Sequence, residues 1–176
     1  MEKEKKSMRL LKISPIIIFC ILSYFLYWKI TNMNESKHLS SAMLNKTLPE
    51  LNLEVLEGDL SITEIKGKKP FIVNYFASWC VPCVAEHEVL KQLNKDYIII
   101  GIGYKDTKAN IKKFISDLGN PYELIMMDPE GRAAINLGLY GVPETYFINE
   151  KGKIKYRQVG PLTEEKFKNI VYLLNK

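Results

Sequence analysis

Two cysteines, Cys80 and Cys83, stand where an apolar segment meets a segment with the pattern of a helix. Residues 71–76 have the β-branched and aromatic composition of a buried strand, and residues 84–90 continue as a helix. A cysteine at the start of a helix has a lowered pKa, because the unpaired N–H groups there stabilise its thiolate. We therefore predict a redox-active dithiol in which Cys80 is the exposed nucleophile, while Cys83 faces inward and resolves the mixed disulfide that Cys80 forms.

Two other interpretations of the cysteine pair stay open. A zinc site would use Cys80, Cys83 and His87 as three ligands, but no fourth is evident, because His38 lies near the start of the chain and Cys20 lies in an apolar segment. A purely structural disulfide across two residues would constrain the unfolded chain very little. We therefore expect neither a metal nor a cofactor beyond the Cys80–Cys83 disulfide, and we expect His87 on the surface of its helix.

The N-terminal residues have the pattern of a membrane anchor. Residues 1–12 contain five Lys and Arg residues and two Glu residues, whereas residues 13–28 carry no charge. Extended over about 20 residues, this apolar run is long enough to cross a hydrocarbon core of about 30 Å. Since positive charge stays on the cytoplasmic side, we expect the chain after Trp28 on the periplasmic side of the inner membrane.

The alternative for this segment is a cleaved signal peptide, but no small-residue cleavage site follows the apolar run directly. A polar stretch of Asn, Ser, Lys and His then precedes the globular part. We expect four regions: a cytoplasmic basic tail (1–12), a transmembrane signal anchor (13–30), a linker (31–46) and one globular domain (47–176).

The charge distribution argues against binding to nucleic acid. The chain has 25 Lys and Arg residues and 20 Asp and Glu residues, but six of the basic and two of the acidic residues precede residue 34. The rest of the chain is therefore close to neutral, with 19 basic and 18 acidic residues. The net charge of +5 reflects membrane topology and leaves no basic patch for a nucleic acid.

The globular part alternates strands and helices. Residues 48–56 alternate apolar and polar side chains, and with a turn at residues 58–59 they predict a short β-hairpin. After the dithiol helix, residues 97–103 form an apolar run that is typical of a strand covered on both faces. Beyond the hairpin, the predicted order is β, α, β, α, β, α, β, β, α, with the dithiol between the first strand and the first helix.

The dithiol junction resembles the thioredoxin superfamily. The resemblance rests on the apolar strand, on the sequence Ala-Ser-Trp-Cys-Val-Pro-Cys over 77–83, and on the amphipathic helix after it. It implies an α/β, thioredoxin-like fold with a central mixed β-sheet flanked by helices. For this chain we also expect one inserted helix–strand unit over about 107–127, an N-terminal hairpin and a single transmembrane helix before the domain. Thioredoxins usually carry a buried Asp at the position of Asn74, so a proton relay needs another acid here.

A second motif is centred on Val142 and Pro143, which follow Gly141 and lead into a predicted strand. A proline in this setting is a candidate for a cis peptide bond. The thioredoxin resemblance implies that Val142 and Pro143 lie against the dithiol. It also implies that the backbone before Pro143 pairs with an extended segment of the substrate.

Three further side chains complete the candidate site. Trp79, directly before the nucleophile, is expected to form the rim of the surface on which the substrate docks. Glu144 follows the proline of the second motif, and it is expected to face the dithiol and exchange a proton with Cys83. Glu86, three residues after Cys83 on the same helix face, is the other candidate for this proton relay.

The second motif narrows the resemblance to one family. The sequence Gly-Leu-Tyr-Gly-Val-Pro-Glu-Thr-Tyr over 138–146, the anchor and the inserted unit resemble the DsbE/CcmG family, in the TlpA/ResA/DsbE branch of the superfamily. The resemblance implies a periplasmic thiol:disulfide oxidoreductase that keeps apocytochrome c, or a thiol-carrying maturation partner, reduced for haem attachment. It also implies that a transmembrane thiol reductase recharges the pair.

The two residues between the cysteines indicate the direction of electron flow, but less strongly than the family resemblance does. Val81 and Pro82 offer neither a charge nor a hydrogen-bond donor to a thiolate, whereas strong oxidants stabilise the thiolate of their reduced form. These two residues therefore favour a reductant or an intermediate carrier. Two alternatives remain: a TlpA- or ResA-like envelope reductant with other clients, and a thioredoxin-fold binding or chaperone module whose dithiol is vestigial.

Overall fold

The computed structural model describes residues 2–31, 43–65 and 69–174 in two units, which we treat separately. The first unit contains helix α1 (Glu2–Thr31), and the second contains all the other elements. In the part of the chain that the structure describes, we find no helix with the length and the apolar character of a membrane span. Most of the predicted linker, residues 32–42, lies outside the described residues.

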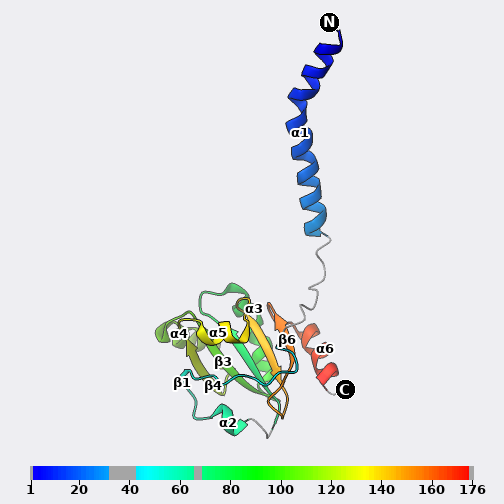
Figure 1. The fold of residues 1–176 in the computed structure, drawn as a ribbon. Helices are drawn as coiled ribbons and strands as arrows, with labels where there is room; N and C mark the ends of the chain where they lie inside the picture. The colour runs from blue at the N-terminus through cyan, green and yellow to red at the C-terminus, as the bar shows by residue number, and fades with distance from the viewer. Residues whose placement is uncertain (1, 32–42, 66–68, 175–176) are drawn as a thin grey trace. The chain divides into compact units, whose positions relative to one another are not determined.

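The second unit is built on one mixed sheet (Figure 1). Strands β2, β3 and β4 are parallel, whereas β1, β5 and β6 each run antiparallel to a neighbour, so the predicted mixed sheet is confirmed. Strand β2 is an interior strand of this sheet, and the dithiol follows its carboxyl end. The order across the sheet is β1 (Glu54–Glu57), β4 (Leu124–Asp128), β3 (Ile98–Tyr104), β2 (Phe71–Phe76), β5 (Glu144–Ile148) and β6 (Ile154–Val159).

Helices contribute to a hydrophobic core on each face of the sheet. Because successive residues of a strand point to opposite faces, β2 places Ile72 and Phe76 in one core and Val73 in the other. The first core also contains Cys80 and Cys83, so we call this side the dithiol face and the other side the opposite face. The dithiol-face core includes residues of α3 (Val81–Leu93), α4 (Lys108–Leu118) and α6 (Glu164–Leu174), and the opposite-face core includes residues of α2 (Ile62–Ile65) and α5 (Arg132–Leu137).

The order of elements from β2 onward is the predicted one: β2, α3, β3, α4, β4, α5, β5, β6, α6. Helix α4 and strand β4 form the inserted unit, and β4 pairs with β3 in parallel. Strand β3 is buried from Ile99 to Gly103 because both of its faces are covered, as its uninterrupted apolar sequence predicts.

The predicted N-terminal hairpin is wrong. Only residues 54–57 form a strand, and this strand pairs with β4 of the inserted unit. The chain then enters α2, because Ser61 and Glu64 cap it: the Ser61 N–H donates to Glu64 Oε2 (3.2 Å), and the Thr63 N–H donates to Ser61 Oγ (3.3 Å). The Ser-x-x-Glu pattern in the sequence is the signal of this capping box.

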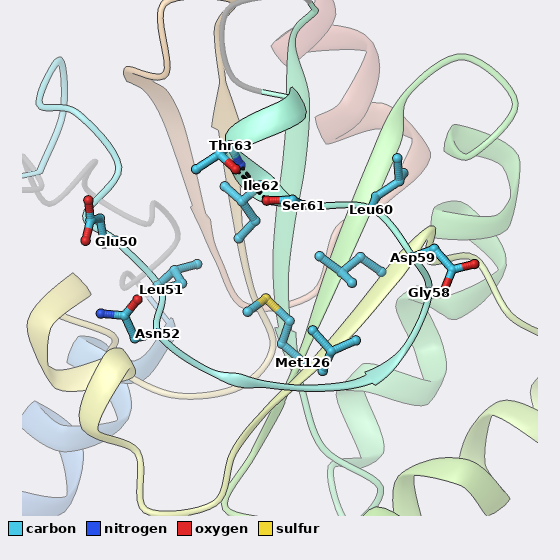
Figure 2. A pocket seen from close by; sticks show the side chains of 12 residues that line it. Glu50, Leu51, Asn52, Gly58, Asp59, Leu60, Ser61, Ile62, Thr63 and Met126 are labelled. Atoms are coloured by element: carbon cyan, nitrogen blue, oxygen red, sulfur yellow. Dashed lines mark hydrogen bonds between the residues drawn. The ribbon is translucent and has the colours of Figure 1, made fainter.

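A pocket of about 540 Å³ lies between this N-terminal segment and strand β4. Figure 2 shows the side chain of Met126 between residues 50–52 and residues 58–63, all of which line the pocket. Leu124 and Met126, which β4 contributes to its wall, belong to the opposite-face core. The pocket is therefore separated from the dithiol by the sheet.

Candidate active site

Cys80 and Cys83 are joined by a disulfide at the start of α3, with 5.3 Å between their Cα atoms. Cys80 is the N-cap of this helix, and the N–H of Cys83 donates to Cys80 Sγ over 3.2 Å. Pro82, in the first turn, removes no hydrogen bond, because the first N–H groups of a helix have no partner within it. The helix therefore directs an N–H group at the sulfur of Cys80, where it stabilises a thiolate after reduction.

The predicted exposure of Cys80 is wrong for this disulfide-bonded state. Cys80 is 3% exposed and Cys83 is 2% exposed. In the disulfide, the sulfur of Cys80 is held at the helix start, and Cys80 belongs to the dithiol-face core. The neighbouring side chains of Trp79 and Val81 are 58% and 79% exposed, so they form the accessible surface beside the pair.

The Val142–Pro143 peptide bond is cis, as predicted. In the register of β5 against β2, Glu144 lies opposite Tyr75, so Pro143 lies beside Phe76, the last residue of β2 before the dithiol loop. Val142 packs against both cores, of which the dithiol-face core contains both cysteines. The two motifs, which are far apart in the sequence, therefore meet at one end of the sheet.

The loop between β3 and α4 supports the dithiol loop, a contact that the sequence did not predict. The Ser78 N–H donates to Asp106 Oδ2 (2.7 Å), and Trp79 Nε1 donates to the backbone oxygen of Lys105 (3.3 Å). Burial raises the pKa of Asp106, but hydrogen bonds from Ser78 and its neighbours outweigh burial and leave that pKa below its usual value. Asp106 is therefore a carboxylate that fixes the backbone just before Cys80.

Glu86 lies on the buried side of α3 and faces strand β2. It is 1% exposed, and its two oxygens accept hydrogen bonds from Asn74 Nδ2 and from the Leu162 N–H, both at 2.8 Å. Burial raises the pKa of Glu86 to about 7, although the hydrogen bonds from Leu162 and Asn74 oppose this effect. A buried carboxyl group that titrates near neutral pH is thus one helical turn from Cys83.

Asn74 connects Glu86 to the inserted unit. Its Nδ2 donates to Thr145 Oγ1 (2.9 Å) as well as to Glu86, and its Oδ1 accepts from the hydroxyl of Tyr122 (2.9 Å). Gly101 makes room for the Tyr122 ring, since a Cβ at this position would lie 2.8 Å from it. The residue at the usual position of the thioredoxin Asp therefore does not titrate but orients another acid. The sequence indicated only that Asn74 cannot titrate.

Glu144 lies on the opposite face of the sheet. It pairs across the sheet with Tyr75, a residue of the opposite-face core, and its carboxylate binds Arg157 and the hydroxyl of Tyr146. The backbone N–H of Tyr140 also donates to this carboxylate, over 3.1 Å. The structure therefore brings Glu86, and not Glu144, to the side of the sheet that holds the cysteines.

The prediction that His87 lies on the surface is wrong. His87 is 2% exposed, its Nε2 is 2.8 Å from the backbone oxygen of Gly119, and its ring packs against Phe114 with 5.2 Å between the ring centroids. The cause is the inserted unit, whose helix α4 covers this part of α3. Burial lowers the pKa of His87, so the ring is neutral at physiological pH.

Comparison of the sequence with known proteins shows the family to which this chain is related. Residues 43–174 match the Redoxin family. Over 159 residues the chain is 39% identical to the thiol:disulfide interchange protein DsbE of Pseudomonas fluorescens biotype C. The aligned region covers 89% of this chain and 88% of that protein. The chain belongs to the DsbE family. It is also 45% identical over 125 residues to the thiol:disulfide interchange protein CycY of Rhizobium leguminosarum bv. viciae, covering 70% and 62% of the two chains.

Solved structures confirm the fold. The crystal structure of a protein named DsbE from Chlorobium tepidum matches 74% of this chain and 97% of its own length with a TM-score of 0.65, at 20% sequence identity. The thioredoxin-like fold predicted from the sequence is therefore confirmed. As a member of the DsbE family with a Cys-X-X-Cys pair at a helix start, the protein is a thiol:disulfide oxidoreductase.

Proposed function

We propose that this DsbE-family protein is a membrane-anchored periplasmic reductant of cytochrome c maturation. The observation that supports this most is the meeting of two motifs at one site, the dithiol at the start of α3 and the cis Val142–Pro143 bond beside it. The proposal assigns catalysis to Cys80 and Cys83, and docking to Val142, Pro143 and Trp79. The substrate is the disulfide between the haem-binding cysteines of apocytochrome c, or that of a maturation partner which carries their oxidising equivalents.

In the proposed reaction the reduced protein transfers two electrons to the substrate. The Cys80 thiolate attacks one sulfur of the substrate disulfide, and the other substrate sulfur leaves as a thiolate and takes up a proton. Cys83 then attacks the sulfur of Cys80, which releases the second substrate thiol and forms the Cys80–Cys83 disulfide. A transmembrane thiol reductase restores the dithiol with two electrons and two protons, and no other cofactor takes part.

Glu86 is the proposed acceptor of the proton that Cys83 loses in the second step. Glu86 follows Cys83 by three residues on α3, so the two side chains share one face of the helix, and both are buried. With a pKa of about 7, Glu86 populates its acid and its carboxylate near neutral pH, as a proton relay requires. We therefore assign the relay to Glu86.

We also propose that residues 13–30 anchor the protein in the inner membrane and that the second unit is periplasmic. The basic residues before this segment set the orientation. In α1, large apolar side chains from Ile16 to Trp28 are exposed, including 70% of Phe19, and lipid would cover them. A reporter enzyme that is active only outside the cytoplasm, fused after Lys176, is expected to be active. Activity of a cytoplasm-specific reporter instead would contradict this topology.

Replacing Cys83 with alanine is expected to trap the substrate. The mixed disulfide on Cys80 then has no resolving thiol, so an adduct that disappears on reduction should accumulate in the cell envelope. Mass spectrometry of the adducts identifies the partners, and the Cys80→Ala/Cys83→Ala variant is the matched control, which should form none. Apocytochrome c or a thiol-carrying maturation partner among the adducts would support the proposal.

The same experiment separates the alternatives. A TlpA- or ResA-like reductant would trap other envelope proteins, and deletion of its gene would leave the level of holocytochrome c unchanged. A binding or chaperone module with a vestigial dithiol would trap nothing, and its function would survive replacement of both Cys80 and Cys83 with serine.

A further inference from the structure

A buried ion pair lies behind the cis-proline segment. Glu144 on β5 and Arg157 on β6 are joined through Oε1 and Nε, and their side chains are 0% and 6% exposed. A charged pair buried this deeply adds little net stability, because the loss of hydration cancels much of the attraction. The groups that the pair binds are therefore the best indication of its role.

The pair is bonded to residues 138–142, the segment that leads into the cis peptide bond. The Tyr140 N–H donates to Glu144 Oε2 (3.1 Å), and Arg157 Nη2 donates to the backbone oxygen of Gly138 (2.7 Å). The Arg157 guanidinium also lies over the Tyr140 ring, 4.4 Å from its centroid. Two backbone contacts and one side-chain contact therefore fix the course of this segment and the position of its aromatic ring.

The Tyr140 ring, although held by Arg157, remains 62% exposed. Tyr140 precedes Val142 by two residues, so their Cα atoms lie within about 7 Å of each other. Val142 in turn packs against both cores, including the one that contains Cys80 and Cys83. A preorganised, exposed aromatic ring two residues before the cis Val142–Pro143 bond has the character of the residues that dominate binding energy in protein interfaces.

We propose that Glu144 and Arg157 are positioning residues that hold residues 138–142 so that Tyr140 contacts the substrate chain beside its disulfide. The occupant is an extended peptide segment that carries a disulfide and presents an apolar side chain to the Tyr140 ring. This inference rests on the proposed docking of the substrate at Val142 and Pro143. It also gives Glu144 a role that its contacts support: its carboxylate binds the loop and does not transfer a proton.

The test compares two substrates of the reduced full-length protein: the small disulfide 5,5′-dithiobis(2-nitrobenzoate) and an extended peptide with a Cys-X-X-Cys disulfide flanked by apolar residues. Tyr140→Ala is expected to raise KM for the peptide by about tenfold, because an interface aromatic is lost, and to leave kcat unchanged. The rate with the small disulfide should not change. Tyr140→Phe keeps the ring and should behave as wild type.

Arg157→Lys tests the positioning itself. Lysine keeps the charge but lacks the planar guanidinium that reaches Gly138 and covers Tyr140, so KM for the peptide should rise as it does in Tyr140→Ala. Arg132→Lys is the matched control, since Arg132 forms an exposed ion pair with Glu130 in which the side chains are 83% and 64% exposed. This variant should change KM for neither substrate. If Arg157→Lys fails to fold, the exposed Tyr140 can still be replaced, and Tyr140→Ala still tests whether this ring contacts the substrate.

Two results would overturn the inference: an unchanged KM for the peptide in Tyr140→Ala, or an equal loss of kcat/KM with the peptide and with the small disulfide. Its failure is distinguishable from failure of the proposed function. A raised peptide KM together with adducts that contain no cytochrome c maturation protein would uphold the role of Tyr140 and contradict the proposed pathway.

Discussion

Replacing Cys80 with serine is expected to lower the rate of disulfide reduction by at least about 10³-fold, because catalysis begins with attack by a thiolate at this position. A serine hydroxyl is not ionised at neutral pH, even with the Cys83 N–H directed at it as it is at the Cys80 sulfur. Cys83 lies within α3, away from the N-cap position at which an N–H group is directed at the Cys80 sulfur, so it is a poor substitute for the lost nucleophile. The rate is measured in a single turnover of the reduced protein with a small disulfide.

Two variants control this experiment. Cys20 is exposed in α1 and forms no disulfide, so Cys20→Ser should retain the wild-type rate. Cys83→Ser should perform the first attack at full speed and then stop at the mixed disulfide. If Cys80→Ser kept most of the wild-type rate while Cys83→Ser lost it, the roles assigned to the two cysteines would be reversed.

The parts of this site that the sequence predicted are set by local chemistry. A proline that leads from a glycine-containing turn into a strand is a candidate for a cis bond, and a Cys-X-X-Cys pair after an apolar run indicates a strand, a turn and a helix start. The order of elements from β2 to α6 follows from the same kind of signal, because each segment carries its own periodicity and its own stop residues. These features can be predicted without knowing which residues pack against them.

The parts that it missed depend on contacts between segments that are distant in the sequence. His87 is buried because α4 packs over it, and its own helix gives no sign of this. Glu86 and Glu144 both lie near a motif, but packing between distant segments decides which side of the sheet each one faces. Glu86 lies on the dithiol face because α3 packs there, whereas the register of β5 against β2 turns Glu144 to the opposite face. The hairpin error has another cause: a local signal, the capping box at Ser61, outweighed the alternation before it.

Replacing Glu86 with glutamine is expected to slow the resolution of the mixed disulfide by about 10²-fold at neutral pH, the lower end of the usual effect of a general base. In the wild type this step should accelerate as the pH rises through about 7, because the carboxylate of Glu86 then becomes available to take the Cys83 proton. The variant should lack this inflection and accumulate the adduct. Glu88, exposed on the same helix, provides the control: Glu88→Gln should leave the pH profile unchanged.

The same pKa makes an independent prediction about stability in the disulfide-bonded protein. The pKa of Glu86 is about 7 in the folded state against 4.5 for a free side chain, so between these pH values the folded state binds a proton that the unfolded state has lost. The free energy of unfolding should therefore fall as the pH rises from 4.5 to about 7, by about 3 kcal/mol through this group. Chemical denaturation across this range should show the fall in the wild type and not in Glu86→Gln. Parallel curves for the two proteins would mean that Glu86 is ionised throughout, and that the proton from Cys83 goes elsewhere.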